Sequence, residues 1–224
     1  MTMKDTKHWA TKSEAAKDEV RDFVEEAVDW VIVHRREAGW TALGVAAAGL
    51  ILGLFLYGRN QRIDAAWDKL SQAELYAYSG RVPEAQTRLG QVVDEGGAPA
   101  ATTLAYMLQG DLNYPHAAYD QALSDYDKAS QAATDPLRPY SQADKVMTLE
   151  AAGKYADCAA AAQSFLDATP DQLMAPQVYV ELARCQAAQG QNDAAKATLQ
   201  RIALQYPNTP WSEWASARLQ TLPK

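Results

Sequence analysis

The chain has 224 residues and a formal net charge of −7 at pH 7. This acidic balance excludes sequence-independent binding of nucleic acid, which requires a basic face. The length is sufficient for a short tail, one membrane span and one domain with a sizeable core. Frequent alanine and only 3 phenylalanines favour closely packed helices.

The N-terminal tail, residues 1–37, is predicted to carry an amphipathic helix from Ser13 to Val33. One face of this helix is apolar, and the opposite face is rich in acids, which anionic lipid head groups would repel. The pattern therefore favours a protein partner, with a solvated lead-in helix as the open alternative. The apolar residues recur at helical spacing on one face, and they are Val20, Phe23, Val24, Ala27, Val28 and Val31.

Residues 38–57 contain no charged side chain and are predicted to form one transmembrane helix. Such a helix extends about 30 Å, the thickness of the bilayer hydrocarbon. A secretory signal has a shorter apolar core, of about 7–15 residues, nearer the N-terminus. A core helix of a soluble domain has a polar face, which this segment lacks. Trp40 and Tyr57 lie where aromatic residues settle at bilayer interfaces.

The charges that flank the span indicate its orientation only weakly. Both sides carry equal numbers of basic residues within reach of the span, namely Arg21, Arg35 and Arg36 before it and Arg59, Arg62 and Lys69 after it. The Arg35–Arg36 pair is adjacent to the span, which favours a cytoplasmic N-terminus.

One face of the span carries small residues, which would allow close packing against a second transmembrane helix. The partner helix would belong to another membrane protein or to a second copy of this chain, giving a homo-oligomer. The residues of this face are Ala42, Ala46, Gly49 and Gly53.

After a link of residues 58–65, helix punctuation recurs in residues 66–207. The units begin at Ala66, Thr103, Pro139 and Pro176. Small residues recur at positions 8 and 20 of the units, where two helices of a pair cross closely. A glycine at position 15 suits the turn between them, and a proline at position 32 ends the second helix. In the second unit, Ala117 replaces the turn glycine.

This pattern resembles the tetratricopeptide repeat, a helix–turn–helix unit that stacks into a solenoid. The predicted fold is all-α, with an N-terminal amphipathic helix, one transmembrane helix and an α-solenoid of about four helix pairs. Residues 208–224 are expected to form a capping helix, since Thr209 suits the N-cap and Pro210 the first helical position.

The resemblance implies a protein-binding groove lined by the first helices of the pairs. Its surface would be apolar and aromatic with scattered acids, which suits an amphipathic helix or an extended apolar segment. Packing of some of these side chains in the core is the alternative. The residues carried over by repeat position are Trp67, Leu70, Leu104, Met107, Asp111, Tyr114, Tyr140, Met147, Glu150, Val180 and Arg184.

Cys158 and Cys185 fall at the same height on neighbouring antiparallel helices of the third and fourth units. A disulfide between them would close a loop of about 27 residues and would imply an oxidising compartment. Alternatively, Cys158 is a small core residue that replaces the alanine of position 20. The pattern leaves both interpretations open.

No motif for catalysis, cofactors or metals is present in the sequence. The histidines His8, His34 and His116 are scattered and lack metal-ligand spacing with the cysteines. Nucleophile-elbow, phosphate-loop, zincin and dinucleotide-binding motifs are missing. We therefore expect a non-catalytic protein without cofactor or bound metal.

The layout of tail, span, the link "GRNQRIDAAWDKLSQAELYAYSG" and C-terminal solenoid resembles the YfgM family of bacterial inner-membrane proteins. The resemblance implies a cytoplasmic N-terminus and a periplasmic repeat domain. It also implies an ancillary role at the SecYEG translocon and in the periplasmic chaperone network that acts on secreted chains. Cys158 and Cys185 would then lie where they can oxidise.

Two other functions fit the same layout. The ending "YPNTPWSEWA" is common in repeat proteins of other envelope assemblies, so a structural adaptor in outer-membrane or cell-wall biogenesis is one alternative. A module that faces the cytoplasm and docks soluble proteins to the membrane is the other.

Overall fold

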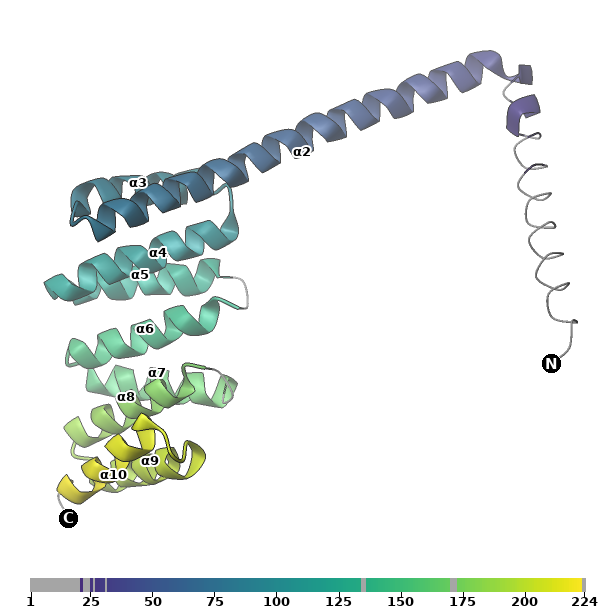
Figure 1. Ribbon diagram of the computed structural model, residues 1–224. Coiled ribbons are helices and arrows are strands. Elements are labelled where there is room, and N and C mark those ends of the chain that lie inside the picture. Colours follow the sequence, from purple (N-terminus) through teal and green to yellow (C-terminus); the bar gives the residue numbers. More distant parts are fainter. Residues whose placement is uncertain are drawn as a thin grey trace, which may run out of the picture. The chain divides into compact units, whose positions relative to one another are not determined.

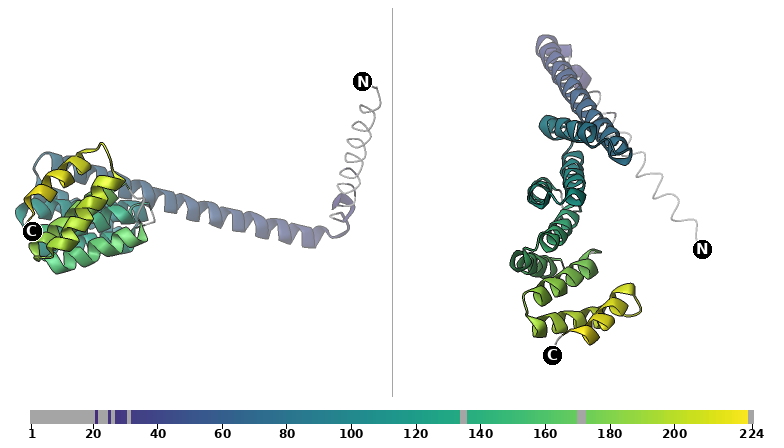
Figure 2. Two further views of the ribbon diagram at one scale, coloured as in Figure 1. Left: turned by 90° about the horizontal axis from the view of Figure 1, so that it is seen from below. Right: turned by 90° about the vertical axis from the view of Figure 1, so that its left-hand side faces the viewer.

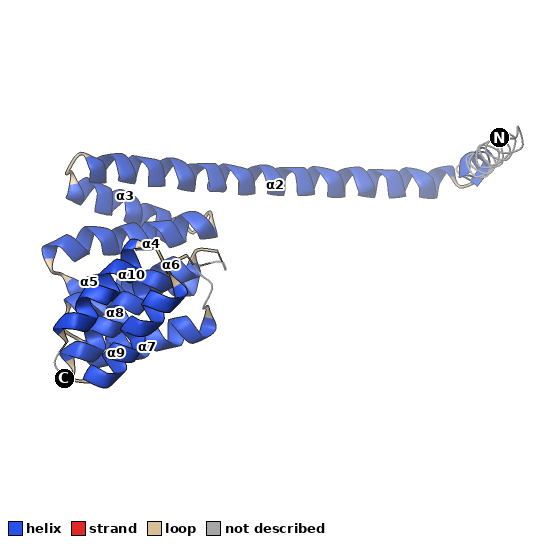
Figure 3. Cartoon of the chain, turned by 60° about the horizontal axis from the view of Figure 1, so that its bottom comes forward, coloured by secondary structure: helices blue, strands red, loops and turns tan. Residues whose placement is uncertain are grey.

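A computed structural model describes residues 21, 25, 27–30, 32–133, 136–169 and 173–222. These residues are almost entirely helical, and they contain no strand (Figure 3). The chain divides into two compact units, Met1–Gly58 and Arg59–Lys224. The predicted amphipathic helix of residues 13–33 falls mostly outside the described residues.

The longest helix, α2, runs from Arg35 to Tyr78 and contains the apolar segment of residues 38–57. It is long and apolar enough to span a membrane, and none of its apolar window is buried within the protein. Leu50 and Ile51, for example, are each 68% exposed. Exposure of so much apolar surface to water is unfavourable by about 25 cal/mol per Å², as expected for a segment that is able to span a membrane.

The second unit is a stack of paired helices (Figure 1). The C-terminal part of α2 pairs with α3, and the later pairs are α4 with α5, α6 with α7 and α8 with α9, followed by α10. The bounds are α3 Val82–Glu95, α4 Pro99–Asn113, the 3₁₀ helix η1 Tyr114–His116, α5 Tyr119–Ala132, α6 Arg138–Ala151, α7 Tyr155–Ala168, α8 Ala175–Ala188, α9 Asn192–Gln205 and α10 Pro210–Thr221.

The first helices of the pairs lie on the inner side of the stack. Helix α6 packs against α8, and α8 packs against α10. The second helices of successive pairs make no comparable contact among the described residues. From α6 to α10, first helices are therefore closer together than second helices, and Figure 2 shows the stack from two further sides. The fold class predicted for this region, a solenoid of tetratricopeptide-like helix pairs, is confirmed.

The repeat spacing works because small side chains occupy the crossing points. Ala73, Ala85 and Ala195 at positions 8 and 20 are completely buried. At Gly110, position 8 of the second unit, an added Cβ would lie 2.6 Å from the ring of Tyr126. Apolar residues pack around these points in two clusters, one around Leu70 and Leu89, the other running from Leu123 to Leu222.

The turns inside the pairs show why glycine recurs at position 15. Gly80, Gly153 and Gly190 have φ angles of 72°, 71° and 73°, in the left-handed region that side chains disfavour. Ala117 occupies the same place in the second pair and has a φ of 55°. It follows η1, where Pro115 ends the first helix early.

Substitution Ala117→Gly should therefore raise the free energy of unfolding by about 0.5–1 kcal/mol. Relief of the left-handed alanine gains about 1–2 kcal/mol, and the extra freedom of glycine in the unfolded chain offsets about 0.4–1 kcal/mol of this. Urea unfolding followed by circular dichroism measures the change. The control Ala152→Gly, at a turn residue with a φ of −75°, should destabilise the protein, and a loss of stability in Ala117→Gly would contradict the argument.

Helix α10 covers the C-terminal end of the stack. Thr209 accepts a hydrogen bond from the Ser212 backbone N–H, and the Ser212 hydroxyl accepts one from the Thr209 N–H, so the two form a capping box. Trp211, Trp214 and Leu219 pack against the larger core cluster. Within the described residues, α10 therefore covers the last helix pair.

Candidate protein-interaction surface

The inner surface of the stack carries most of the predicted groove residues. Met107 and Asp111 come from α4, Tyr114 from η1, Met147 and Glu150 from α6. Each of these keeps part of its surface accessible. Trp67 and Tyr140 are 39% and 37% exposed. The Arg184 side chain, on α8, is 44% exposed.

Two groove predictions are wrong. Leu70 and Val180 are only 2% and 3% exposed and belong to the core clusters. Both occupy position 5 of their units, and Ala143 at position 5 of the third unit is completely buried as well. Position 5 therefore faces the core in the first, third and fourth units, whereas Met107 at position 5 of the second unit keeps part of its surface accessible. Leu104 is partly buried against the core cluster around Leu70 and Leu89, the N-terminal core cluster.

A small pocket of about 140 Å³ lies on this surface between α4, α5 and α6. The Tyr126 hydroxyl donates a 2.7 Å hydrogen bond to Oδ1 of Asp111. Burial, together with the neighbouring carboxylates of Asp111 and Asp144, raises the pKa of Tyr126 well above its ordinary value. The other lining residues are Tyr114, Met147 and Thr148. The pocket thus presents two carboxyl groups on an aromatic and thioether wall.

Asp144 is the most perturbed acid of this pocket. Burial, and secondly the charge of Asp111, raise the pKa of Asp144 to about 7. An unfolded aspartate ionises near pH 3.9. Between about pH 4 and pH 7 the folded protein therefore holds a proton that the unfolded chain has lost, so the free energy of unfolding should fall as the pH rises through this window and level off above it.

Substitution Asp144→Asn should flatten that pH dependence. At pH 8 it should raise the free energy of unfolding by about 1–2 kcal/mol, less than the full pKa difference because the side chain keeps contact with solvent. Urea unfolding at pH 5.5 and pH 8 measures the effect, with Asp193→Asn on the exposed face of α9 as the control. An unchanged pH dependence in Asp144→Asn would remove Asp144 as its source.

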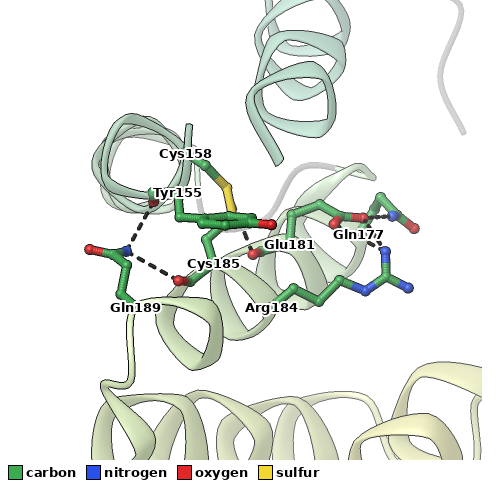
Figure 4. Close-up of a disulfide and its surroundings, with 7 residues drawn as sticks. All are labelled: Tyr155, Cys158, Gln177, Glu181, Arg184, Cys185 and Gln189. Atoms are coloured by element: carbon green, nitrogen blue, oxygen red, sulfur yellow. Dashed lines mark hydrogen bonds and ion pairs between the residues drawn. A yellow bond between two sulfur atoms is a disulfide. The ribbon is translucent and has the colours of Figure 1, made fainter. Parts of the chain in front are cut away.

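A second acidic group lies toward the C-terminal end of the surface. Glu181, on α8, is 3% exposed. Its carboxyl accepts hydrogen bonds from the Gln177 amide and from the Arg184 guanidinium, the latter at 3.2 Å (Figure 4). Burial raises the pKa of Glu181, and Arg184 opposes this while Glu150 adds to it. The same carboxylates, after burial, contribute to a raised pKa of Tyr114.

Arg184 connects this acidic group to a wider cavity of about 620 Å³ near α10. Its guanidinium lies 5.5 Å from the ring centroid of Trp214, within the range of a cation–π contact. Glu150, Tyr155 and Arg218 also line the cavity. The inner surface therefore has the acids Asp111 and Asp144 along its middle and the cations Arg184 and Arg218 toward its C-terminal end.

A disulfide joins the third and fourth helix pairs beside this surface. Cys158 of α7 is bonded to Cys185 of α8, with the Cα atoms 6.3 Å apart (Figure 4). Both cysteines are completely buried. The Gln189 amide donates hydrogen bonds to the carbonyl oxygens of Tyr155 and Cys185, at 3.0 and 3.1 Å. The bridge thus holds α7 and α8 together within the core.

Sequence reasoning missed the residues that give the surface its charge and its aromatic wall. Asp144 and Glu181 both occupy position 6 of their units. The signal available in the sequence was the acid at the same position, position 6, of the first helix in both the third and the fourth units. Tyr126 and Trp214 could not be found in this way, because they reach the surface from α5 and α10. The described residues hold no group of three potential metal ligands.

Comparison with known proteins is consistent with the repeat architecture. Residues 149–220, from the end of α6 to α10, match the tetratricopeptide repeat family. No curated protein matches the chain. PilF of Pseudomonas aeruginosa has a solved structure that is 16% identical in sequence and similar at a TM-score of 0.44, over 71% of this chain and 85% of that one. The family match identifies the C-terminal part of the chain as tetratricopeptide-like repeats, a fold that typically binds proteins.

Proposed function

We propose that this protein is a non-catalytic, membrane-anchored scaffold that binds other proteins on the inner surface of its solenoid. The observation that carries the proposal is the combination of carboxylates with aromatic and methionine side chains on that surface. Asp111, Asp144 and Glu150 lie along it beside Tyr114 and Met147. A surface of this kind offers both apolar contact and charge.

The charges favour a particular kind of segment. Arg184, toward the C-terminal end of the surface, is already paired with Glu181. An acidic peptide would meet repulsion in the middle of the surface, whereas a segment with apolar side chains and a Lys or Arg would place its cation between Asp111 and Asp144. A cation close to Asp144 favours the ionised carboxylate, so binding of a basic segment should strengthen as the pH rises through about 7.

The apolar segment of α2 supplies the membrane anchor in this proposal. A span at residues 38–57 would tether the solenoid to the bilayer, and the arginine pair before the span favours a cytoplasmic tail. The disulfide of Cys158 and Cys185 supports an oxidising compartment for the solenoid, which in a bacterium is the periplasm. The resemblance to the YfgM family then favours a role beside the SecYEG translocon, with periplasmic chaperones or secreted chains as partners.

Charge reversal on the inner surface tests the scaffold function. The full-length protein with Asp111→Lys and Glu150→Lys should lose its partners in affinity purification from mild detergent. The matched control carries Asp157→Lys and Asp193→Lys, on exposed faces of α7 and α9, and should retain them. Both variants should keep wild-type circular dichroism. Equal recovery of partners by the two variants would exclude the inner surface as the binding site.

The identity of the recovered proteins tests the finer assignment. Recovery of translocon subunits or periplasmic chaperones supports it, and recovery only of another envelope machine would instead favour the adaptor function. A C-terminal alkaline phosphatase fusion should be active if the solenoid is periplasmic. If the phosphatase fusion were inactive, and a fluorescent protein fused to the C-terminus were fluorescent, the solenoid would lie in the cytoplasm.

A further inference from the structure

The first helix of each pair has a face that covers the preceding pair. Ser141, position 3 of the third unit, has its Oγ 2.9 Å from the Oγ of Ser130 in the preceding α5. Cys185, position 10 of the fourth unit, is bonded to Cys158 in the preceding α7. Positions 3 and 10 are seven residues apart and therefore share one side of the helix. These contacts define an inter-repeat face.

That face is enclosed wherever a preceding pair exists. The residues at position 3 of units two to four are each 0% exposed, and they are Ala105, Ser141 and Val178. At position 10, Thr148 and Cys185 are also 0% exposed. Leu112, the residue at position 10 of the second unit, packs against the N-terminal core cluster. The inter-repeat face thus requires an amphipathic helix against it in each of these units.

In the first unit, no helix among the described residues covers the same face. Its positions 3 and 10 are Asp68 and Leu75 in α2, and Leu75 is 67% exposed. Tyr78, one turn further, is 94% exposed. We call the stripe formed by Asp64, Asp68, Ser71, Leu75 and Tyr78 the open edge. These residues follow one another at intervals of three and four, so they lie on one side of α2.

Charged and apolar side chains lie at opposite ends of the open edge. Its N-terminal part carries the exposed acids Asp64 and Asp68, and its C-terminal part carries Leu75 and Tyr78. The nearby Lys69 is turned away, because its ammonium group pairs with Glu95 of α3. A helix that covers this edge therefore needs apolar side chains opposite Leu75 and cations opposite the two aspartates.

We propose that the open edge binds an amphipathic helix of a partner protein, antiparallel to α2, in the place that a preceding repeat would occupy. Antiparallel packing sets the C-terminal turns of the partner helix opposite Asp64 and Asp68. Lys or Arg in those turns would pair with the aspartates and would also interact favourably with the helix dipole. This site is separate from the acidic inner surface, so the chain can hold two partner segments at once.

A designed peptide tests this proposal. The probe is a fluorescein-labelled helical peptide with one leucine face and two lysines in its C-terminal turns, and its twin has glutamates in place of the lysines. The full-length protein is held in nanodiscs of zwitterionic lipid, with empty nanodiscs as the background. Fluorescence anisotropy should show binding of the lysine peptide above this background and at least tenfold weaker binding of the glutamate peptide.

Variants assign the binding site. Leu75→Asp should lower the affinity for the lysine peptide at least tenfold. Leu204→Asp, at an 80% exposed leucine of α9, should leave this affinity unchanged. Asp68→Lys should reverse the preference so that the glutamate peptide binds more tightly. Because the inner surface also suits a segment with a lysine, the same comparison is made in the Asp111→Lys/Glu150→Lys background, where the lysine peptide should still bind and Leu75→Asp should still remove that binding.

Several results would overturn the proposal. No binding above empty nanodiscs, or equal affinity for Leu75→Asp and the wild type, excludes the open edge as a helix site. Loss of affinity only in the Asp111→Lys/Glu150→Lys variant places the peptide in the groove instead. A dimer in native mass spectrometry that dissociates in Leu75→Asp would identify a second copy of the chain as the occupant, in contradiction to a partner helix.

Discussion

Removal of the disulfide should cause the largest loss of stability of any paired substitution in the solenoid. The double variant Cys158→Ala/Cys185→Ala should lower the free energy of unfolding by about 3–4 kcal/mol, because the bridge closes a loop of 27 residues and restricts the unfolded chain. Urea unfolding of the full-length protein in mild detergent, followed by circular dichroism, measures the change in midpoint.

Two controls separate the bridge from the packing of the cysteine side chains. The wild type treated with a reductant should unfold at nearly the same urea concentration as the double variant, and the reductant should not affect the double variant. Both cysteines are buried, so truncation to alanine by itself removes only a small side chain. A midpoint shift of less than a quarter of the expected size would mean that the bridge is weakly stabilising or only partly formed.

Gly110→Ala is expected to be the most damaging substitution of a glycine inside the described helices. Its Cβ would lie 2.6 Å from the ring of Tyr126, and that ring is buried and fixed through the hydrogen bond of its hydroxyl to Asp111. Overpacking of this kind costs about 1–3 kcal/mol, which exceeds the gain of about 0.5–1 kcal/mol from the better helix propensity of alanine. The net result should be a lower free energy of unfolding.

Gly90→Ala is the matched control, since Gly90 lies inside helix α3 and an added Cβ would meet nothing within 4 Å. That variant should be stabilised by about 0.5–1 kcal/mol. The same urea titration compares both variants with the wild type. A Gly110→Ala variant as stable as Gly90→Ala would contradict the close contact between α4 and α5 at this point.

The repeat architecture could be predicted because it depends on local sequence. Turn positions such as Gly153 and crossing positions such as Ala195 require small residues wherever a helix pair folds back on itself, so their spacing alone indicates the pairs. Even the exception, Ala117, takes the left-handed conformation of the glycines at its position. The interval between the repeats thus contains enough information to predict the solenoid.

The binding surface was less predictable, because it depends on how the pairs stack. Leu70 and Val180 lie at a position assigned to the groove, yet the packing of neighbouring helices buries them. Conversely, Asp144 acquires its raised pKa from burial in the stack and, secondly, from the charge of Asp111 in another helix pair. Tyr126 and Trp214 reach the surface from helices outside the first-helix series. Contacts between pairs are not encoded in the spacing within one pair.

Site-specific photocrosslinking in living cells tests the central claim most directly. A benzophenone amino acid at Met147, on the inner surface, is compared with the same residue at Leu204, on the exposed face of α9. We predict adducts at Met147 that contain a defined partner protein and that disappear in the Asp111→Lys/Glu150→Lys background. Adducts of equal yield at both positions, or adducts at Leu204 only, would contradict a binding function of the acidic inner surface.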